Sequence, residues 1–278
     1  MRLRMVQLMS ATPATAHPLV DCHAHVYTRD MPASDTAWHL PPHDATIEDY
    51  IATLDAHGVH FAVLAAASIY GDYNDYALEA VRRHKRLRTT VIVDPDIDPY
   101  AMQRMSDAGV VGIRFQFRNV AEPPDLTTYA YRRLMRRAAD LGWHIHLHDE
   151  GPRIASFIEP ILAAGPRLVI DHYGRPDPSQ GERAPEFQAV LRAVEGGRTW
   201  VKMSADFRIA TPELARVLGA SLLANAGTER LLWGSDWPFA AYEDRMTYAK
   251  ALANFATIVP DAGQRREMDR TALKLYFG

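Results

Sequence analysis

Eight short apolar segments, rich in β-branched residues, recur along the chain and alternate with longer segments of helical periodicity. They span residues 19–26, 60–68, 88–95, 110–117, 143–148, 167–172, 199–204 and 230–236. Two of the intervening segments, 46–58 and 127–142, are amphipathic and end on a glycine, as helices commonly do. Eight strand–helix units within 278 residues are typical of a (β/α)8 barrel, the TIM barrel. We therefore expect an α/β protein with one parallel sheet.

The barrel is expected to occupy residues 18–278 as a single domain, because no linker or low-complexity composition divides that stretch. Residues 1–17 begin with basic residues, and their apolar stretch, MVQLM, is shorter than the core of a signal peptide. We expect them to form a flexible leader. The loop 28–44 after the first strand is long enough to form a lid or a pocket wall.

The composition argues against several classes of partner. The 31 Lys and Arg residues nearly match the 34 Asp and Glu residues, and the net charge of −3 provides no basic surface for nucleic acid or an anionic membrane. No apolar run approaches the roughly 20 residues needed to span a bilayer. The single cysteine, Cys22, cannot form an internal disulfide, so we expect a cytoplasmic protein whose fold depends on packing.

The segment VDCHAHV places His23 and His25 two positions apart on the first predicted strand. Successive side chains of a strand alternate between its faces, so the two imidazoles are expected to share a face while Cys22 and Ala24 point the other way. Two imidazoles on one face can hold a metal ion. A pair of this kind is equally consistent with packed, hydrogen-bonded histidines, so it decides nothing alone.

Three other strand ends carry similar chemistry, namely His148, His172 and Asp236. The carboxyl ends of barrel strands converge in space, and an inward-facing carboxylate is unfavourable unless it meets a cation, a donor or water. These ends together with the histidine pair predict an active centre. His144 and His146 lie deeper on the same face as His148, where we expect them to fill the barrel interior.

With these motifs in place, the chain resembles the amidohydrolase superfamily and, within it, the amidohydrolase-2 branch. The resemblance rests on DCHAH, VIVDPDID, GVVGIRFQF, VIDHYGRPD and LLWGSDWPF, in that order, and runs nearly the length of the chain. Within the branch, these phrases are similar to those of the lactonases that act on 2-pyrone-4,6-dicarboxylate, sulfomuconolactone and sugar lactones. The resemblance implies a hydrolase that opens a small lactone bearing a carboxylate.

The resemblance also implies roles for particular residues. His23, His25 and His172 would polarise the lactone carbonyl, and Asp236 would activate water. The chemistry agrees, because hydrolysis of a cyclic ester needs an electrophile at the carbonyl oxygen and a base for the attacking water.

Four residues are expected to contact the substrate. The resemblance implies that Arg114 and Arg208 bind substrate carboxylates, for which the planar fork of a guanidinium is suited. Arg118 is close enough in sequence to Arg114 to reach a second acidic group, although a solvated loop charge is equally consistent. Ser68, at the end of the second predicted strand, is able to donate to a ligand oxygen or to cap the loop.

The involvement of a metal is left open by the residues. The pyrone lactonase is understood to work without a metal and to have tyrosine where this chain has His148. His148 instead resembles the third ligand of zinc-dependent decarboxylases of the same branch. Three imidazoles and one carboxylate suit Zn²⁺. We expect a divalent ion, most simply zinc, held by His23, His25, His148 and Asp236, with a metal-free mechanism as the alternative.

Two other functions are consistent with the same residues. One is a zinc-dependent non-oxidative decarboxylase of an aromatic or unsaturated acid, which His148 favours and the lactonase-like phrases oppose. The other is a barrel that binds a ligand without catalysis. The expected partner is a small anionic lactone. The sequence leaves the oligomeric state open, with a homodimer as the commonest arrangement for such enzymes.

Overall fold

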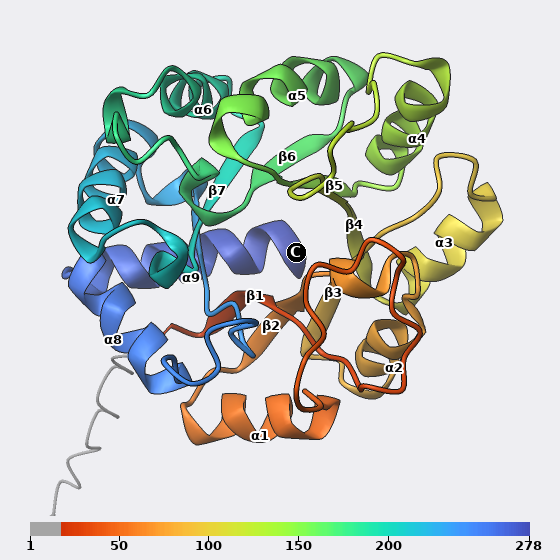
Figure 1. Cartoon of the computed structure of the whole chain (residues 1–278), viewed down its shortest axis with the longest axis horizontal. Helices are drawn as coiled ribbons and strands as arrows, with labels where there is room; N and C mark the ends of the chain where they lie inside the picture. The colour runs from red at the N-terminus through yellow and green to blue at the C-terminus, as the bar shows by residue number, and fades with distance from the viewer. Residues whose placement is uncertain (1–17) are drawn as a thin grey trace, which may run out of the picture.

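The computed structural model describes residues 18–278, so the expected leader at 1–17 lies outside the described residues. Eight parallel strands follow one another around a single sheet in chain order (Figure 1). The strands are β1 Val20–Ala24, β2 Phe61–Leu64, β3 Leu87–Val91, β4 Val110–Gln116, β5 His144–His148, β6 Arg167–Ile170, β7 Thr199–Ser204 and β8 Leu231–Gly234. Seven of the eight segments predicted as strands contain the whole strand, and β3 begins one residue before its predicted segment; the (β/α)8 barrel is confirmed.

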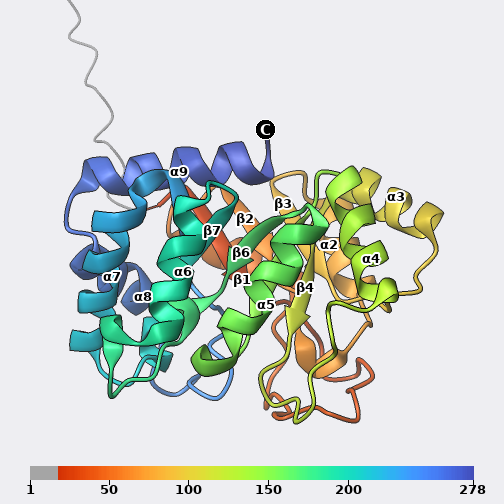
Figure 2. The ribbon, with the colours of Figure 1, turned by 90° about the horizontal axis from the view of Figure 1, so that it is seen from above.

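The helices surround the sheet and cover its outer face, except for the last, which lies across one end of the barrel (Figures 1 and 2). They are α1 Ile47–Ala56, α2 Asp75–Arg83, α3 Pro99–Ala108, α4 Tyr129–Asp140, α5 Gly151–Ala164, α6 Pro185–Glu195, α7 Pro212–Ala226, α8 Tyr248–Ile258 and α9 Ala262–Tyr276. The two helices predicted by their patterns are α1 and α4. Thr46 caps α1 by accepting a hydrogen bond from the Asp49 amide. Within residues 18–278, no helix is both long and apolar enough to cross a bilayer.

The first and last strands close the barrel through a short seam rather than a full ladder. The His25 amide donates to the Trp237 carbonyl at 2.8 Å, and the Asp236 amide donates to the His23 carbonyl at 2.7 Å. Gly234 permits this approach, because a Cβ there would lie 2.5 Å from the Cβ of His23. The seam therefore brings the β1 histidines beside the residue that follows β8.

The amino-terminal end of the barrel interior is apolar. Cys22 packs there with Val63, Val169 and Leu232, and the cluster includes side chains of α9. Figure 2 shows α9 lying along this end of the barrel, with the long loop after β1 at the opposite end. The expectation that Cys22 faces away from His23 was wrong, because the β1 register shifts between Asp21 and Ala24 and interrupts the simple alternation.

Candidate active site

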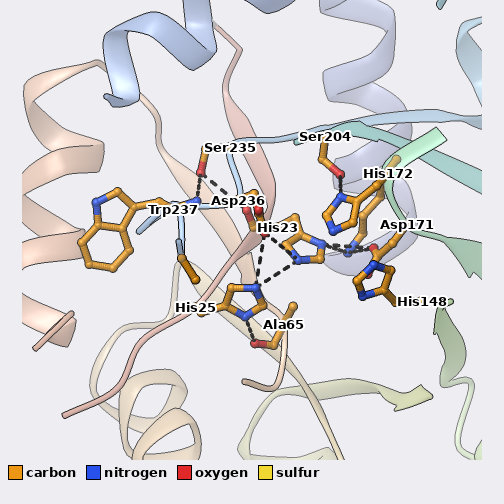
Figure 3. A network of polar contacts seen from close by, with 12 residues as sticks. His23, His25, Ala65, His148, Asp171, His172, Ser204, Ser235, Asp236 and Trp237 are labelled. Atoms are coloured by element: carbon orange, nitrogen blue, oxygen red, sulfur yellow. Dashed lines mark hydrogen bonds and ion pairs between the residues drawn. The ribbon is translucent and has the colours of Figure 1, made fainter. Parts of the chain in front are cut away.

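Residues that follow the strands converge at the carboxyl end of the barrel (Figure 3). Three of them adopt left-handed backbone conformations, His172 with φ 50°, Ala205 with φ 52° and Asp236 with φ 62°. Residues other than glycine rarely adopt this conformation, and it is concentrated at functional sites. At β6, β7 and β8 it turns the chain sharply where the strand ends, and it directs His172 and Asp236 toward His23.

Three potential ligand atoms face one another at the seam. The Nε2 atoms of His23 and His25 lie 3.3 Å apart, and each is 3.4 Å from Oδ1 of Asp236. His25 Nδ1 is 2.8 Å from the carbonyl oxygen of Ala65, which can only accept a hydrogen bond. Nδ1 must therefore carry the proton, and Nε2 of neutral His25 presents a lone pair.

His23 has the same tautomer, with the proton on Nδ1 and the lone pair on Nε2. Its Nδ1 lies 3.1 Å from Oδ1 of Asp171, a carboxylate that can accept a proton donor. With Nδ1 donating to Asp171, the Nε2 lone pair of His23 points toward His25 and Asp236. Two lone pairs and a carboxylate oxygen then face one point with no donor among them, an arrangement that a cation would stabilise.

The spacing of these atoms fits a divalent ion. Ligand atoms placed 2.0–2.1 Å from a tetrahedrally coordinated zinc lie about 3.3 Å from one another. The three distances at the seam match this value. Nitrogen and carboxylate donors are also the set that zinc prefers. His23, His25 and Asp236 therefore have the chemistry and the spacing of a metal site.

His148 lies in an adjoining group. Among residues 18–278, the groups with metal-ligand spacing join it to Asp171 and His172, not to the three atoms at the seam. Its Nδ1 is 3.5 Å from an Nη atom of Arg114, and its buried Nε2 has no hydrogen-bond partner. The structure thus places three of the four predicted ligands together and the fourth in the next group.

His172 lies between the two groups. Its ring centroid is 4.8 Å from that of His23 and 4.8 Å from that of His148. Its Nδ1 is 2.8 Å from the Ser204 hydroxyl. Burial holds the pKa values of His23, His148 and His172 well below the usual histidine range, because it disfavours the charged imidazolium. All three imidazoles are neutral at neutral pH.

Asp236 is ionised. Burial opposes its ionisation, but the Arg208 guanidinium outweighs that effect and holds its pKa well below the usual range. Arg208 Nε donates to Oδ2 of Asp236 at 2.7 Å, and its Nη2 donates to the Ala240 carbonyl. Arg208, predicted to bind substrate, is therefore also the partner of the predicted base.

A pocket opens above these groups. Its lining includes the predicted residues His25, Ser68, Arg114, Arg118, His148, His172, Arg208 and Asp236, together with Trp38 of the long loop after β1. His23 lies fully buried, in contact with Asp236. The structure therefore brings every predicted catalytic and substrate-binding residue to one place, and the loop forms part of the wall as expected.

The predicted substrate-binding residues differ in burial and in the partners that already hold them. Arg114 is buried and donates to the Ala66 carbonyl at 2.6 Å and to Asp171 at 3.2 Å. Arg118 is half-buried and pairs with Glu150 at the rim. Ser68 opens the short 3₁₀ turn Ser68–Tyr70 at the pocket edge.

Two further residues of the site, Asp171 and Lys202, were not among the predicted site residues. Both are fully buried, with Lys202 Nζ 3.6 Å from Oδ1 of Asp171. Burial opposes ionisation of Asp171, but the surrounding imidazoles and Lys202 hold its pKa well below the usual range. Burial lowers the pKa of Lys202 to about 8. The available signal for Asp171 was its place in VIDH, directly before a strand-end histidine.

Comparisons with known proteins agree with this geometry. The amidohydrolase family model matches residues 20–278. The 4-sulfomuconolactone hydrolase of Hydrogenophaga intermedia is 30% identical over 257 residues, which cover 89% of this chain and 84% of that protein.

Two crystal structures share the fold over nearly the whole chain. A putative 2-pyrone-4,6-dicarboxylic acid hydrolase from Pseudomonas putida has a TM-score of 0.86 and 32% identity, covering 94% of this chain and 97% of that one. A probable 2-pyrone-4,6-dicarboxylic acid hydrolase from Acinetobacter baumannii, with citric acid bound, has a TM-score of 0.89 and 26% identity, covering 94% and 100%. The chain belongs to the amidohydrolase family, as its motifs indicated.

Proposed function

We propose that this protein is a hydrolase that opens a small lactone bearing a carboxylate or a comparable anionic group. One observation carries the proposal: the ionised Asp236 and the facing His23 and His25 imidazoles adjoin a pocket that is also lined by three arginines, Arg114, Arg118 and Arg208. The carboxylate and imidazoles suit ester hydrolysis, and the guanidinium groups suit an anionic substrate. The similar proteins named as lactone hydrolases support the same reaction.

The residues define a sequence of steps. Water attacks the lactone carbonyl carbon while Asp236 accepts its proton, and the ring C–O bond then breaks as the leaving oxygen regains a proton. The Ser204 hydroxyl is able to donate to Nδ1 of His172, which leaves the Nε2 proton of that neutral imidazole to donate to the developing oxyanion. Arg114 and the rim arginine Arg118 orient the substrate through its anionic groups.

A divalent ion is part of the proposal. When bound, it would polarise the carbonyl and lower the pKa of the attacking water. His23, His25 and Asp236 would hold it. His148 is proposed as a further ligand through its buried Nε2, which has no hydrogen-bond partner; this requires the 3.5 Å contact of Arg114 with Nδ1 to give way, because a donor at Nδ1 leaves the proton of the neutral ring on Nε2. Zinc suits this nitrogen and oxygen set.

The decarboxylase alternative retains one supporting observation, the unpartnered His148 Nε2 beside the pocket. Product analysis separates the two functions. Purified protein is incubated with 2-pyrone-4,6-dicarboxylate and with 4-sulfomuconolactone while ring absorbance, acid release and carbon dioxide are followed, before and after chelation. Elemental analysis of the same sample identifies the metal. We expect one equivalent of acid per ring opened and no carbon dioxide. Release of carbon dioxide from an aromatic acid, without lactone opening, would reject the proposal.

We also infer a cytoplasmic location and a homodimeric state. The location is supported by the single cysteine, which has no partner for an internal disulfide. The dimer rests on the general frequency of two-fold assemblies, and light scattering of the purified protein tests it.

A further inference from the structure

The Asp171 carboxylate is surrounded by nitrogen donors from four strands or strand ends. Its Oδ1 lies 3.1 Å from His23 Nδ1 and 3.6 Å from Lys202 Nζ, and it also contacts His146 Nε2. Its Oδ2 accepts a hydrogen bond from Arg114 Nη2 at 3.2 Å. Asp171 is fully buried, so solvent does not compete for these contacts. One carboxylate therefore connects the histidine at the seam to the arginine of the pocket.

The proton on His23 depends on which neighbour its Nδ1 faces. Nδ1 lies 3.1 Å from Asp171 Oδ1 and 3.3 Å from Lys202 Nζ. An ionised carboxylate only accepts, so it favours a proton on Nδ1 and a lone pair on Nε2. A lysine ammonium only donates, so it favours the opposite tautomer. Asp171 and Lys202 thus favour different protonation patterns at the nitrogen facing His25 and Asp236.

Arg114 is held in a similar way. Its guanidinium donates to Asp171 Oδ2 and to the Ala66 carbonyl, and its buried Nε has no hydrogen-bond partner. Two acceptors on separate elements fix the plane of the guanidinium where it lines the pocket. Loss of Asp171 would leave the Ala66 carbonyl and the longer, 3.5 Å contact with His148 Nδ1 to orient it.

We propose that Asp171 is a positioning residue, one of whose oxygens sets the tautomer of His23 while the other sets the direction of Arg114. The Nε2 lone pair of His23 then faces the seam, and the Arg114 fork faces the anionic substrate. The role of Arg114 rests on the proposed function. The effect of Asp171 on the tautomer of His23 does not depend on the proposed function, so it is tested separately from the effect on Arg114.

The first measurement is the tautomer of His23 in protein treated with chelator, read from imidazole ¹⁵N–¹H spectra and assigned with His23→Gln. In the wild type we expect the proton on Nδ1. In Asp171→Ala we expect this preference to be lost, because Lys202 Nζ becomes the neighbour of Nδ1. Lys202→Met should keep the wild-type tautomer, since Asp171 remains. A His23 proton that stays on Nδ1 in Asp171→Ala would overturn the inference.

The second measurement is affinity for Co²⁺, followed by its visible spectrum. Loss of a carboxylate that orients a metal-binding histidine typically weakens metal binding 10- to 100-fold, and we expect that loss for Asp171→Ala. Asp269→Ala is the matched control, because Asp269 is a buried acid that accepts from the Leu19 and Val20 amides at the far end of β1. It should lower stability and leave Co²⁺ affinity unchanged. Equal losses of Co²⁺ affinity in Asp171→Ala and Asp269→Ala would show that Asp171 has only a structural role.

Removing Asp171 leaves two buried cations without their shared carboxylate, so the single variant is at risk of misfolding. The double variant Asp171→Ala/Lys202→Met removes one of those cations. It replaces the single variant in the tautomer measurement if Asp171→Ala misfolds. It is expected to lose the Nδ1 preference of His23, and retention of that preference would again overturn the inference. The two proposals can fail separately. If the wild type opens no lactone but Asp171→Ala folds and shows an altered His23 tautomer, the proposed function is refuted and the positioning role of Asp171 remains.

Discussion

The two ends of the barrel are built from the same eight strands but from opposite chemistry. At the carboxyl end, ionised and neutral polar groups such as Asp171, Asp236 and Arg114 are buried against one another. At the amino end, Val20, Cys22 and other apolar side chains pack against α9. The strands therefore carry reactive groups where they end and apolar side chains where they begin.

This division indicates where the stability of the fold originates. Burying a side chain such as Leu232 at the amino end contributes about 1.5–3 kcal/mol. A buried ion pair at the carboxyl end contributes little net stability, because desolvation offsets the attraction between its charges. The left-handed conformations of His172 and Asp236 are also unfavourable. The apolar end thus compensates for the strain and desolvation of the reactive end.

The largest expected difference between the ends is in catalysis. Asp236→Asn removes the proposed base and should lower kcat by about 10²- to 10⁴-fold on an anionic lactone. Asp269→Asn alters a buried acid at the amino end and should leave kcat unchanged. Steady-state kinetics on both folded variants checks the contrast. A fully active Asp236→Asn would remove the catalytic distinction between the two ends and would show that Asp236 is not the base.

A substitution at the amino end should have the converse effect. Leu232 is fully buried in the cluster beneath α9, so Leu232→Ala should lower the free energy of unfolding by about 2–5 kcal/mol. The pocket residues lie at the other end, so KM and kcat should stay at wild-type values below the unfolding temperature. Urea denaturation and kinetics on one preparation test this. A large fall in kcat would show that the two ends are coupled.

The sequence predicted the fold and the members of the site for separate physical reasons. Strand periodicity and glycine-ended helices are local signals, and barrel closure then places strand ends together whatever their separation in sequence. His23, His25, His172 and Asp236 could therefore be found from their positions at strand ends. In the structure His25, His172 and Asp236 line one pocket, and the buried His23 contacts Asp236 beneath it.

The remaining details depend on contacts that a sequence does not encode locally. The register shift in β1, which turns Cys22 into the interior, arises from its pairing with β2. The role of Asp171 follows from four partners on different strands. Arg208 was predicted for substrate, and only the structure shows that it also pairs with Asp236. Such contacts require the assembled barrel.

The pH dependence of stability tests whether histidines near the amino end are also buried as neutral groups. Burial lowers the pKa of His144 to about 3, and its ring lies 5.4 Å from that of Tyr276 in α9. The unfolded pKa is higher, about 6.5, so stability is fully present above that value and is lost as the pH falls toward the folded value. Between pH 7 and pH 5, this group alone should lower the free energy of unfolding by about 2 kcal/mol.

His144→Gln should therefore reduce the difference in unfolding free energy between pH 7 and pH 5 by about that amount. Chemical denaturation in the presence of a chelator measures the difference without a contribution from metal release. His43→Gln, on an exposed part of the loop after β1, is the control and should leave it unchanged. An unchanged difference in His144→Gln would mean that His144 does not remain neutral inside the folded barrel.

The smallest expected effect is on KM, and it comes from the exposed rim of the pocket at the carboxyl end. The comparison is between an arginine at this rim and one in the buried floor of the same pocket. Arg118 is only half-buried and is already paired with Glu150, so its contact with a substrate anion is screened by solvent. Arg118→Ala should raise KM by no more than about fivefold, equivalent to about 1 kcal/mol, with kcat unchanged. Arg114→Ala, in the buried floor, should raise KM more than tenfold, since a buried hydrogen bond to a charged group contributes about 1.5–3 kcal/mol. Equal effects of the two variants would show that substrate binding is shared evenly between floor and rim, and that burial does not determine which arginine anchors the anion.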